Sequence, residues 1–300
     1  MPGTQESGES LDAPPPAWRR ETRHDNRAVP LYKRDGAARS RRWIFPMPLL
    51  EIDQLSIRFG GLWALQGFSF TLDQGELVAL IGPNGAGKTT AFNIVTGVYA
   101  PTSGSIRLNG QAVHGQSPAA LNHAGLARTF QNIRLFQNLS VLENVTVALH
   151  SVRSGLLSTV LRGPAFHSQR HERNHEGMRL LETLRLAHLA TRPARTLPYG
   201  DQRRLEIARA LATNPRILLL DEPAAGMNPQ EKIELMDLIR FIRDTFRVGV
   251  WLIEHDMKLV MSICRRITVL DHGETIAVGP PAQVQADPKV IEAYLGEPVK

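Results

Sequence analysis

The chain has 300 residues, of which 42% are hydrophobic and 21% charged, and its formal net charge is +6. This composition supports a folded core and excludes a wholly disordered chain, and the length predicts about two domains. A single cysteine, Cys264, excludes an internal disulfide framework and indicates a reducing compartment. No apolar run approaches the ~20 residues that cross a bilayer, so we expect a soluble protein or one held at a membrane by a partner.

Residues 1–48 differ in composition from the rest of the chain. They contain the run Pro14–Pro16 and scattered arginines, and they show no helical or strand periodicity. Such a segment buries too little apolar surface to offset the entropy lost when it is ordered. We therefore expect a disordered, basic and proline-rich tail over 1–48, with Met47 as an alternative start, and one folded domain over 49–300.

Two patterns of hydrophobicity follow along the chain. Apolar and polar residues alternate in 55–59 and 68–72, which predicts two half-exposed strands. Continuous apolar runs predict strands buried on both faces at 77–81, 217–220 and 248–253. Because strands, loops and helices alternate along the chain, the sequence favours an α/β fold with a parallel core sheet.

Two helical regions are predicted outside these strands. The stretch from about 133 is helical in pattern and charged, and we expect a helical subdomain over about 133–212, inserted into the domain. Asn228 can cap a second helix that starts at Pro229. Ile233, Met236, Ile239 and Ile242 would then fall on one face of that helix.

A phosphate-binding pattern, G-x-x-x-x-G-K-[ST], follows the first buried strand. Its residues are Gly82, Pro83, Asn84, Gly85, Ala86, Gly87, Lys88 and Thr89, followed by Thr90. Glycines let backbone N–H groups approach a phosphate, and the following helix adds its positive end. We expect Lys88 to bind the β- and γ-phosphates and the Thr89 hydroxyl to bind Mg²⁺. A chance match in a glycine-rich turn is the alternative, which the flanking strand and helix disfavour.

The second buried strand ends in two carboxylates, Asp221 and Glu222. Strand ends of a parallel sheet line the ligand crevice. We expect Asp221 to hold Mg²⁺ through water and Glu222 to polarise the attacking water. An ordinary acidic loop is the alternative. Together with the phosphate-binding pattern, the carboxylates predict an enzyme that hydrolyses or transfers a nucleotide phosphate.

The stretch 197–211 resembles the signature motif of ABC transporter ATPases. Other positions match that family in chain order. Phe59 resembles its adenine-stacking aromatic residue and Gln131 its Q-loop glutamine, while residues 225–229 resemble its D-loop and His255 its switch histidine. The resemblance covers Leu50 to the C-terminus. It implies an ABC-type nucleotide-binding domain with a RecA-like parallel-sheet core, an antiparallel β subdomain and an inserted helical subdomain.

Within that family the chain resembles the ATP-binding subunits of high-affinity branched-chain amino acid importers, the Liv G type. The segments that carry this resemblance are 128–136, 199–202, 221–226 and the ending 291–296. It implies ATP hydrolysis coupled to amino acid uptake, with ATP and Mg²⁺ as cofactors. It also implies transmembrane permease subunits as partners, a periplasmic binding protein as an indirect one, and a peripheral position at the cytoplasmic face of the inner membrane.

Two nucleotide-binding subunits of that family pair head to tail, and each ATP lies between the phosphate loop of one and the signature motif of the other. The resemblance thus implies that Tyr199, Gly200 and Asp201 contact ATP held by a partner, either a second copy or a related paralogue. His255 would contact the γ-phosphate, and Gln131 would link the metal to the transporter interface. Pro198 replaces the usual serine, which predicts weaker closure; the sequence offers no physical account of Asp201, which replaces a glutamine.

Other interpretations stay open at this stage. A related ABC ATPase of lipopolysaccharide export would carry similar core motifs. ABC ATPases acting on ribosomes or DNA usually have two nucleotide-binding units or coiled-coil insertions, and a regulator without turnover is a third possibility. We expect no nucleic-acid partner, because no motif that reads RNA or DNA is present. The pattern H-E-x-x-H at 171–175 is flanked by arginines, so we expect a solvated helix face rather than a zinc site.

Overall fold

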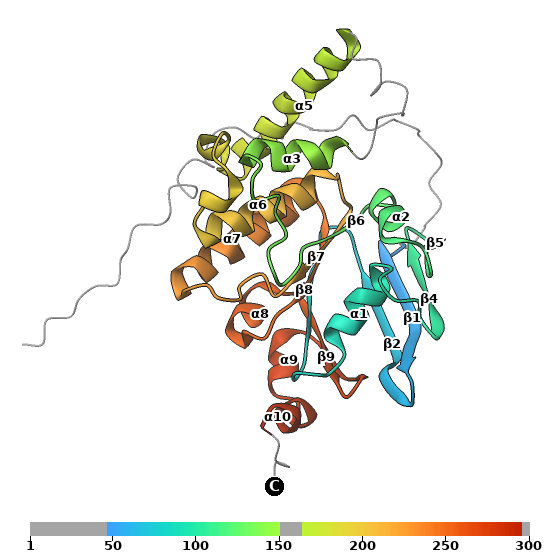
Figure 1. Cartoon of the computed structure of the whole chain (residues 1–300). Coiled ribbons are helices and arrows are strands. Elements are labelled where there is room, and N and C mark those ends of the chain that lie inside the picture. The colour runs from blue at the N-terminus through green and yellow to red at the C-terminus, as the bar shows by residue number, and fades with distance from the viewer. Residues whose placement is uncertain (1–46, 151–163, 296–300) are drawn as a thin grey trace, which may run out of the picture. The chain divides into compact units, whose positions relative to one another are not determined.

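The computed structural model describes residues 47–150 and 164–295, which belong to a compact unit spanning 44–300 (Figure 1). The predicted tail therefore lies outside the described residues, apart from Met47 and Pro48, and stays a prediction. The described residues contain two sheets with helices around them, which confirms the predicted α/β class.

The first sheet is antiparallel, with strand order β2-β1-β4-β5. Its strands are β1 (Leu50–Phe59), β2 (Leu62–Leu72), β4 (Ser103–Leu108) and β5 (Gln111–Ala112). Buried residues alternate with exposed ones along the end of β2, where Phe68, Phe70 and Leu72 are buried. The alternation of the sequence thus corresponds to one face turned toward the core and one toward solvent, as is common in antiparallel sheets.

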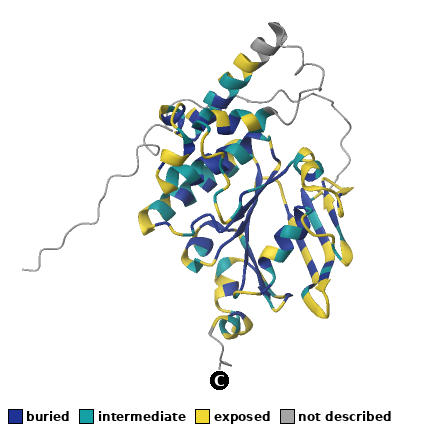
Figure 2. Ribbon diagram, viewed as in Figure 1, coloured by how far each residue is buried: buried dark blue, intermediate teal, exposed yellow. Residues whose placement is uncertain are grey.

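The second sheet is mainly parallel, with strand order β10-β9-β3-β8-β7-β6. Its strands are β3 (Leu77–Ile81), β6 (Leu126–Arg128), β7 (Ile217–Asp221), β8 (Gly249–Ile253), β9 (Arg266–Asp271) and the antiparallel β10 (Glu274–Gly279). Every residue of β3, β7 and β8 is buried, as Figure 2 shows. Alternate residues of β3 enter two different hydrophobic clusters, one on each face of the sheet.

The helices cover both faces of this parallel sheet. Helix α1 (Lys88–Val95) lies between the two sheets (Figure 1), and α2 (Pro118–His123) follows β5. The helical region expected over 133–212 contains α3 (Val141–His150), α5 (Pro164–Thr183), two 3₁₀ turns (Ala187–Leu189 and Ala194–Thr196) and α6 (Tyr199–Ala212). The C-terminal part holds α7 (Pro229–Phe246), α8 (Met257–Ile263), α9 (Pro281–Gln285) and α10 (Pro288–Leu295).

The predicted start of α7 is confirmed, but the four apolar residues expected on one face of this helix differ in burial. Asn228 accepts a hydrogen bond from the Glu231 N–H and forms a capping box. Leu235, Ile239 and Ile242 are buried, whereas Ile233 is 49% exposed. An α-helix turns about 100° per residue, so Ile233 lies about 120° around the axis from Ile239 and faces solvent.

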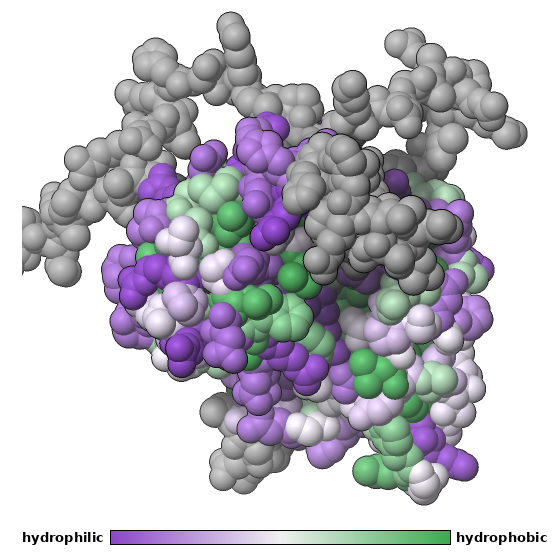
Figure 3. All heavy atoms as spheres, turned by 45° about the horizontal axis from the view of Figure 1, so that its top comes forward, coloured by the Kyte–Doolittle hydropathy of each residue, from purple (hydrophilic) through white to green (hydrophobic). Residues whose placement is uncertain are grey.

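Among the described helices, none combines the length and the apolar character needed to cross a membrane. Figure 3 shows one face of the molecule, on which hydrophilic and hydrophobic residues are interspersed.

Candidate active site

The phosphate loop, residues 82–90, follows β3 and includes the first residues of α1. Gly82 has φ +150°, and a Cβ there would lie 2.0 Å from the Leu270 carbonyl oxygen, so only glycine fits. Gly87 is the N-cap of α1 with φ +102° and supplies no capping side chain. The first N–H groups of α1 are therefore available to an external acceptor at the positive end of the helix, which suits a phosphate.

Lys88 is buried at the start of α1, with its ammonium group held by the loop itself. Its Nζ donates to the carbonyl oxygens of Gly82 (2.7 Å) and Pro83 (2.8 Å). Burial lowers the pKa of Lys88, while the nearby carboxylates of Glu222 and Asp221 act in the opposite direction. The lysine thus sits between the loop and the two carboxylates that end β7.

Three residues predicted to be catalytic meet at one carboxylate oxygen. Oε2 of Glu222 accepts a hydrogen bond from Gln131 Nε2 (2.7 Å) and lies 2.8 Å from His255 Nε2. These residues follow β6, β7 and β8, which are neighbouring strands, so the parallel sheet brings their ends together. Glu222 itself has φ +47°, an uncommon backbone conformation for this residue.

The predicted magnesium ligands lie on two adjoining elements. Thr89 is exposed in the first turn of α1, and Asp221 is the last residue of β7. Oδ2 of Asp221 lies 2.7 Å from Nη2 of Arg128 at the end of β6. Sequence reasoning missed this pairing; the available signal was an arginine at the end of a strand that adjoins the Asp221 strand.

A further carboxylate near Glu222 was also missed. Glu254 is buried between β8 and His255, and its Oε1 accepts a hydrogen bond from the Ala224 N–H (2.8 Å). Its Oε2 accepts from the His255 N–H (3.3 Å). Burial raises the pKa of Glu254. Its position directly after a buried strand, beside His255, was the signal that could have identified it.

The signature segment, residues 198–201, forms the start of α6. Pro198 is the N-cap, and the Tyr199 hydroxyl donates to the Ala225 carbonyl oxygen (2.9 Å). Asp201 lies in the first turn, where a negative charge is favoured by the helix dipole, and it is 3.7 Å from Arg204. Within the described ranges, no hydrogen bond or ion pair joins this segment to the phosphate loop.

A buried ion pair connects α6 to the segment around Gln131. Arg203 and Glu206 are both buried, with Nη1 and Oε2 2.7 Å apart. The Arg203 guanidinium also donates to the carbonyl oxygens of Phe130 (2.7 Å) and Gln131 (2.8 Å). Glu206 Oε1 accepts from the N–H groups of Phe130 and Arg134. This link was not predicted, although charged residues among the apolar positions of 203–211 were visible in the sequence.

The predicted adenine-stacking residue, Phe59, is exposed at the end of β1. Its ring lies edge-to-face with that of Tyr99, with centroids 5.2 Å apart. The adjoining strand β2 borders the phosphate loop, because a Cβ on Gly87 would lie 2.7 Å from the Ala64 carbonyl oxygen. Tyr99 was not singled out from the sequence.

The H-E-x-x-H pattern lies on α5, with His171, Glu172 and His175 exposed. Among the described residues, no group of three or more His, Cys, Asp or Glu side chains is arranged so that it could hold a metal ion.

Comparison with known proteins identifies the family. A model of ABC transporters matches residues 65–225. The chain is 48% identical over 251 residues to the branched-chain amino acid transport ATP-binding proteins BraF of Pseudomonas aeruginosa and LivG of Escherichia coli, covering 83% of this chain and 98% of each relative. The chain belongs to the ABC transporter family. As a member of this family, it is an ATP-binding transporter subunit that hydrolyses ATP.

Two further comparisons bear on the subgroup and the fold. A model of branched-chain amino acid ATP-binding cassette transporters matches residues 274–300. LptB of Escherichia coli, an ATP-binding protein of lipopolysaccharide export, is 33% identical, with 84% of this chain and 98% of LptB covered. The structure of a nucleotide-free ATP-binding cassette from an ABC transporter matches with a TM-score of 0.73 and 30% identity, covering 84% of this chain and 100% of that one.

Proposed function

We propose that this ABC ATPase drives the import of branched-chain amino acids as a peripheral subunit at the cytoplasmic face of the inner membrane. The observation that carries the proposal is the 48% identity to BraF and LivG along nearly their whole length. The match of residues 274–300 to a branched-chain amino acid transporter model adds to it. The lower identity to LptB, 33%, disfavours lipopolysaccharide export.

Glu222 is the proposed catalytic base. Gln131 and His255 both contact Oε2 of its side chain, which orients the carboxylate and leaves Oε1 for the attacking water. In this arrangement Glu222 takes the proton as water attacks the γ-phosphate, while Lys88 and the N–H groups of the phosphate loop hold the phosphate oxygens.

Magnesium fits the donor set of this site. Thr89 offers a hydroxyl and Asp221 a carboxylate, which are the oxygen ligands that Mg²⁺ prefers, and Gln131 can add an amide oxygen. When bound, the ion would neutralise part of the phosphate charge. Phe59 would stack on the adenine, with Tyr99 supporting its ring.

A second nucleotide-binding subunit would complete the site. The signature segment contacts the Ala225 loop of its own chain, and in the part of the chain that the structure describes no hydrogen bond or ion pair joins it to the phosphate loop. Head-to-tail pairing would bring Tyr199, Gly200 and Asp201 to ATP held by the partner, at the N-terminal end of α6, where an anion is favoured. The partner would be a second copy or a related paralogue.

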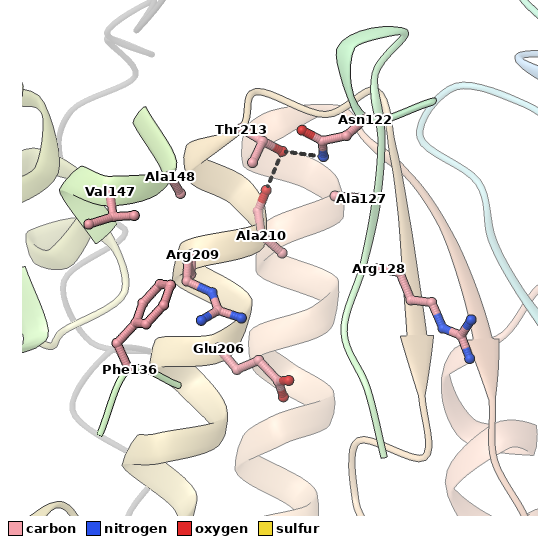
Figure 4. A pocket seen from close by; sticks show the side chains of 10 residues that line it. All are labelled: Asn122, Ala127, Arg128, Phe136, Val147, Ala148, Glu206, Arg209, Ala210 and Thr213. Carbon is pink, nitrogen blue, oxygen red and sulfur yellow. Dashed lines mark hydrogen bonds between the residues drawn. The ribbon is translucent and has the colours of Figure 1, made fainter. Parts of the chain in front are cut away.

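A groove between α3, α6 and the end of β6 is the proposed contact with a permease subunit. Its volume is about 300 Å³, and Figure 4 shows the side chains that line it. Phe136 is 48% and Val147 44% exposed, and the Arg209 guanidinium lies 5.4 Å from the Phe136 ring. Glu206, which contacts the segment around Gln131, also lines the groove. A permease segment held here would therefore adjoin the residues that orient Glu222.

The test is reconstitution of the chain with its permease subunits in proteoliposomes. ATP hydrolysis should rise when a binding protein loaded with a branched-chain amino acid is added, and the amino acid should accumulate inside. Phe136→Ala should reduce this stimulation, whereas Val278→Ala, at an equally exposed position on β10, should not. If the rate of hydrolysis does not change when the loaded binding protein is added, the proposed coupling of hydrolysis to uptake is wrong. If lipopolysaccharide stimulates hydrolysis instead, the proposed substrate class is wrong.

A further inference from the structure

An arginine holds one oxygen of the proposed magnesium ligand Asp221. Nη2 of Arg128 lies 2.7 Å from Oδ2 of Asp221, and the two side chains are only 7% and 6% exposed. In the described ranges, the other oxygen, Oδ1, accepts no hydrogen bond. The carboxylate is thus fixed on one side and free on the other.

Arg128 is itself held in place by α1. Its Nη1 donates to Oδ1 of Asn93 (2.8 Å) and to Oγ1 of Thr96 (3.1 Å). The guanidinium also lies 5.6 Å from the ring centre of Phe92 and 5.1 Å from that of Phe130. A guanidinium bound on several sides in this way cannot leave Asp221 without breaking contacts to the helix that begins at the phosphate loop.

We propose that Arg128 is a positioning residue for the metal, which holds Asp221 by Oδ2 so that Oδ1 faces the water shell of Mg²⁺. This inference rests on the proposed magnesium–ATP site. Arg128 connects three parts of that site, since β6 carries it, β7 ends in Asp221, and α1 carries Thr89. It has no contact with the reacting atoms in this arrangement and acts only through Asp221.

Two opposing effects of Arg128 on metal affinity can be compared. Its positive charge repels a cation, whereas its hydrogen bond orients the carboxylate. Groups that orient metal-ligating side chains typically contribute about 10- to 100-fold to affinity. Because Arg128 uses a different oxygen from the one left for the metal, we expect orientation to dominate. Removing the guanidinium should then weaken magnesium binding.

The experiment measures binding of a fluorescent ATP analogue against Mg²⁺ concentration, in a Glu222→Gln background that prevents turnover. Arg128→Met should raise the half-saturating Mg²⁺ concentration about tenfold or more. Its affinity for the analogue in EDTA should stay within about twofold of the parent protein. Arg128→Lys should recover part of the loss, because lysine keeps the charge but cannot contact Asp221, Asn93 and Thr96 together.

Arg134→Met is the matched control. Like Arg128, Arg134 lies near the Phe130 ring, with its guanidinium 4.0 Å from the ring centre. Unlike Arg128, it pairs with no carboxylate among the described side chains. Its magnesium dependence should equal that of the parent protein. If Arg128→Met does not fold, Asn93→Ala replaces it, since it removes one support of Arg128 and leaves the ion pair; it should shift the magnesium dependence by about two- to threefold in the same direction.

An unchanged or tighter magnesium dependence in Arg128→Met would overturn the inference. An equal loss of ATP binding in EDTA would also overturn it, because it would show a general structural role. If the parent protein itself binds ATP without any dependence on Mg²⁺, the proposed magnesium–ATP site is wrong.

Discussion

The phosphate loop and the signature segment differ in how far one chain completes them. Around the phosphate loop, Lys88, Gln131, Glu222 and His255 already contact their neighbours at 2.7–2.8 Å. The signature segment is exposed or half-buried at the start of α6, and its side chains contact Ala225, Arg203 and Arg204. The first region is built from the ends of buried parallel strands, and the second from the end of one helix.

This difference follows from where each region lies in the fold. Strand ends fixed by a fully buried sheet hold the groups that would act on water and phosphate. The signature segment lies in the exposed first turn of α6, whereas the rest of that helix packs into the core through residues such as Leu205, Ile207 and Leu211. The Arg203–Glu206 pair joins the two regions, because it binds the backbone of Phe130 and Gln131 from α6. Each region can therefore be tested separately, as can the pair that joins them.

The largest effect is expected at the phosphate-loop side. Glu222→Gln should lower the rate of ATP hydrolysis about 10²- to 10⁴-fold, because an amide cannot accept the proton of water. ATP binding should persist, since the loop and Lys88 are unchanged. Phosphate release and nucleotide binding measure the two effects. Glu274→Gln, on the exposed strand β10, is the control; unchanged hydrolysis in Glu222→Gln would show that another group is the base.

The sequence predicted the residues around the phosphate loop better than the contacts that connect them to other elements. Continuous apolar runs located the buried strands, the carboxylates after one of these runs singled out Glu222, and the resemblance to ABC ATPases singled out Gln131 and His255. The partners of these residues could not be found in the same way. Asp221 meets Arg128, and Arg203 meets Phe130, across more than 70 positions of the chain. A local pattern specifies a strand or helix, but it does not specify which side chain of another element reaches it.

The next largest effect is expected at the link between the regions. Arg203→Met should lower the free energy of unfolding by about 3–5 kcal/mol, because it leaves the buried Glu206 carboxylate without its partner. The double variant Arg203→Met with Glu206→Leu should lose less than this. Urea unfolding of the two variants measures the difference.

Arg204→Met provides the comparison for that link. Arg204 pairs with Glu234 at 2.8 Å, but both side chains are about one-third exposed, so its loss should cost at most about 1 kcal/mol. Equal losses in Arg203→Met and Arg204→Met would contradict the importance assigned to the buried pair.

A loss of stability of similar size is expected inside the phosphate loop. Gly82→Ala would place a Cβ 2.0 Å from the Leu270 carbonyl oxygen. Overpacking and a strained backbone each cost about 1–3 kcal/mol. We expect a lower unfolding temperature and weaker ATP binding. Gly61→Ala, where a Cβ meets no atom within 4 Å, should change neither; normal ATP binding in Gly82→Ala would mean that the loop can shift away from β9.

The smallest effect, a gain, is expected in the signature segment. Pro198 begins α6 without a capping side chain and without an N–H, so Pro198→Ser adds a hydroxyl at the position where the family has one. One added hydrogen bond to the γ-phosphate across the subunit interface contributes about 0.5–1.5 kcal/mol, or about two- to tenfold in ATP-dependent association. Sedimentation with and without ATP in the Glu222→Gln background measures this change in association.

Serine also caps helices well, which would stabilise α6 whether or not a partner is present. Pro198→Ala therefore serves as a second variant, and thermal unfolding without ATP records the capping gain separately. A serine variant that is more heat-stable but associates no more tightly than the alanine variant would show that the hydroxyl serves its own helix, and that the signature segment meets ATP through backbone N–H groups alone.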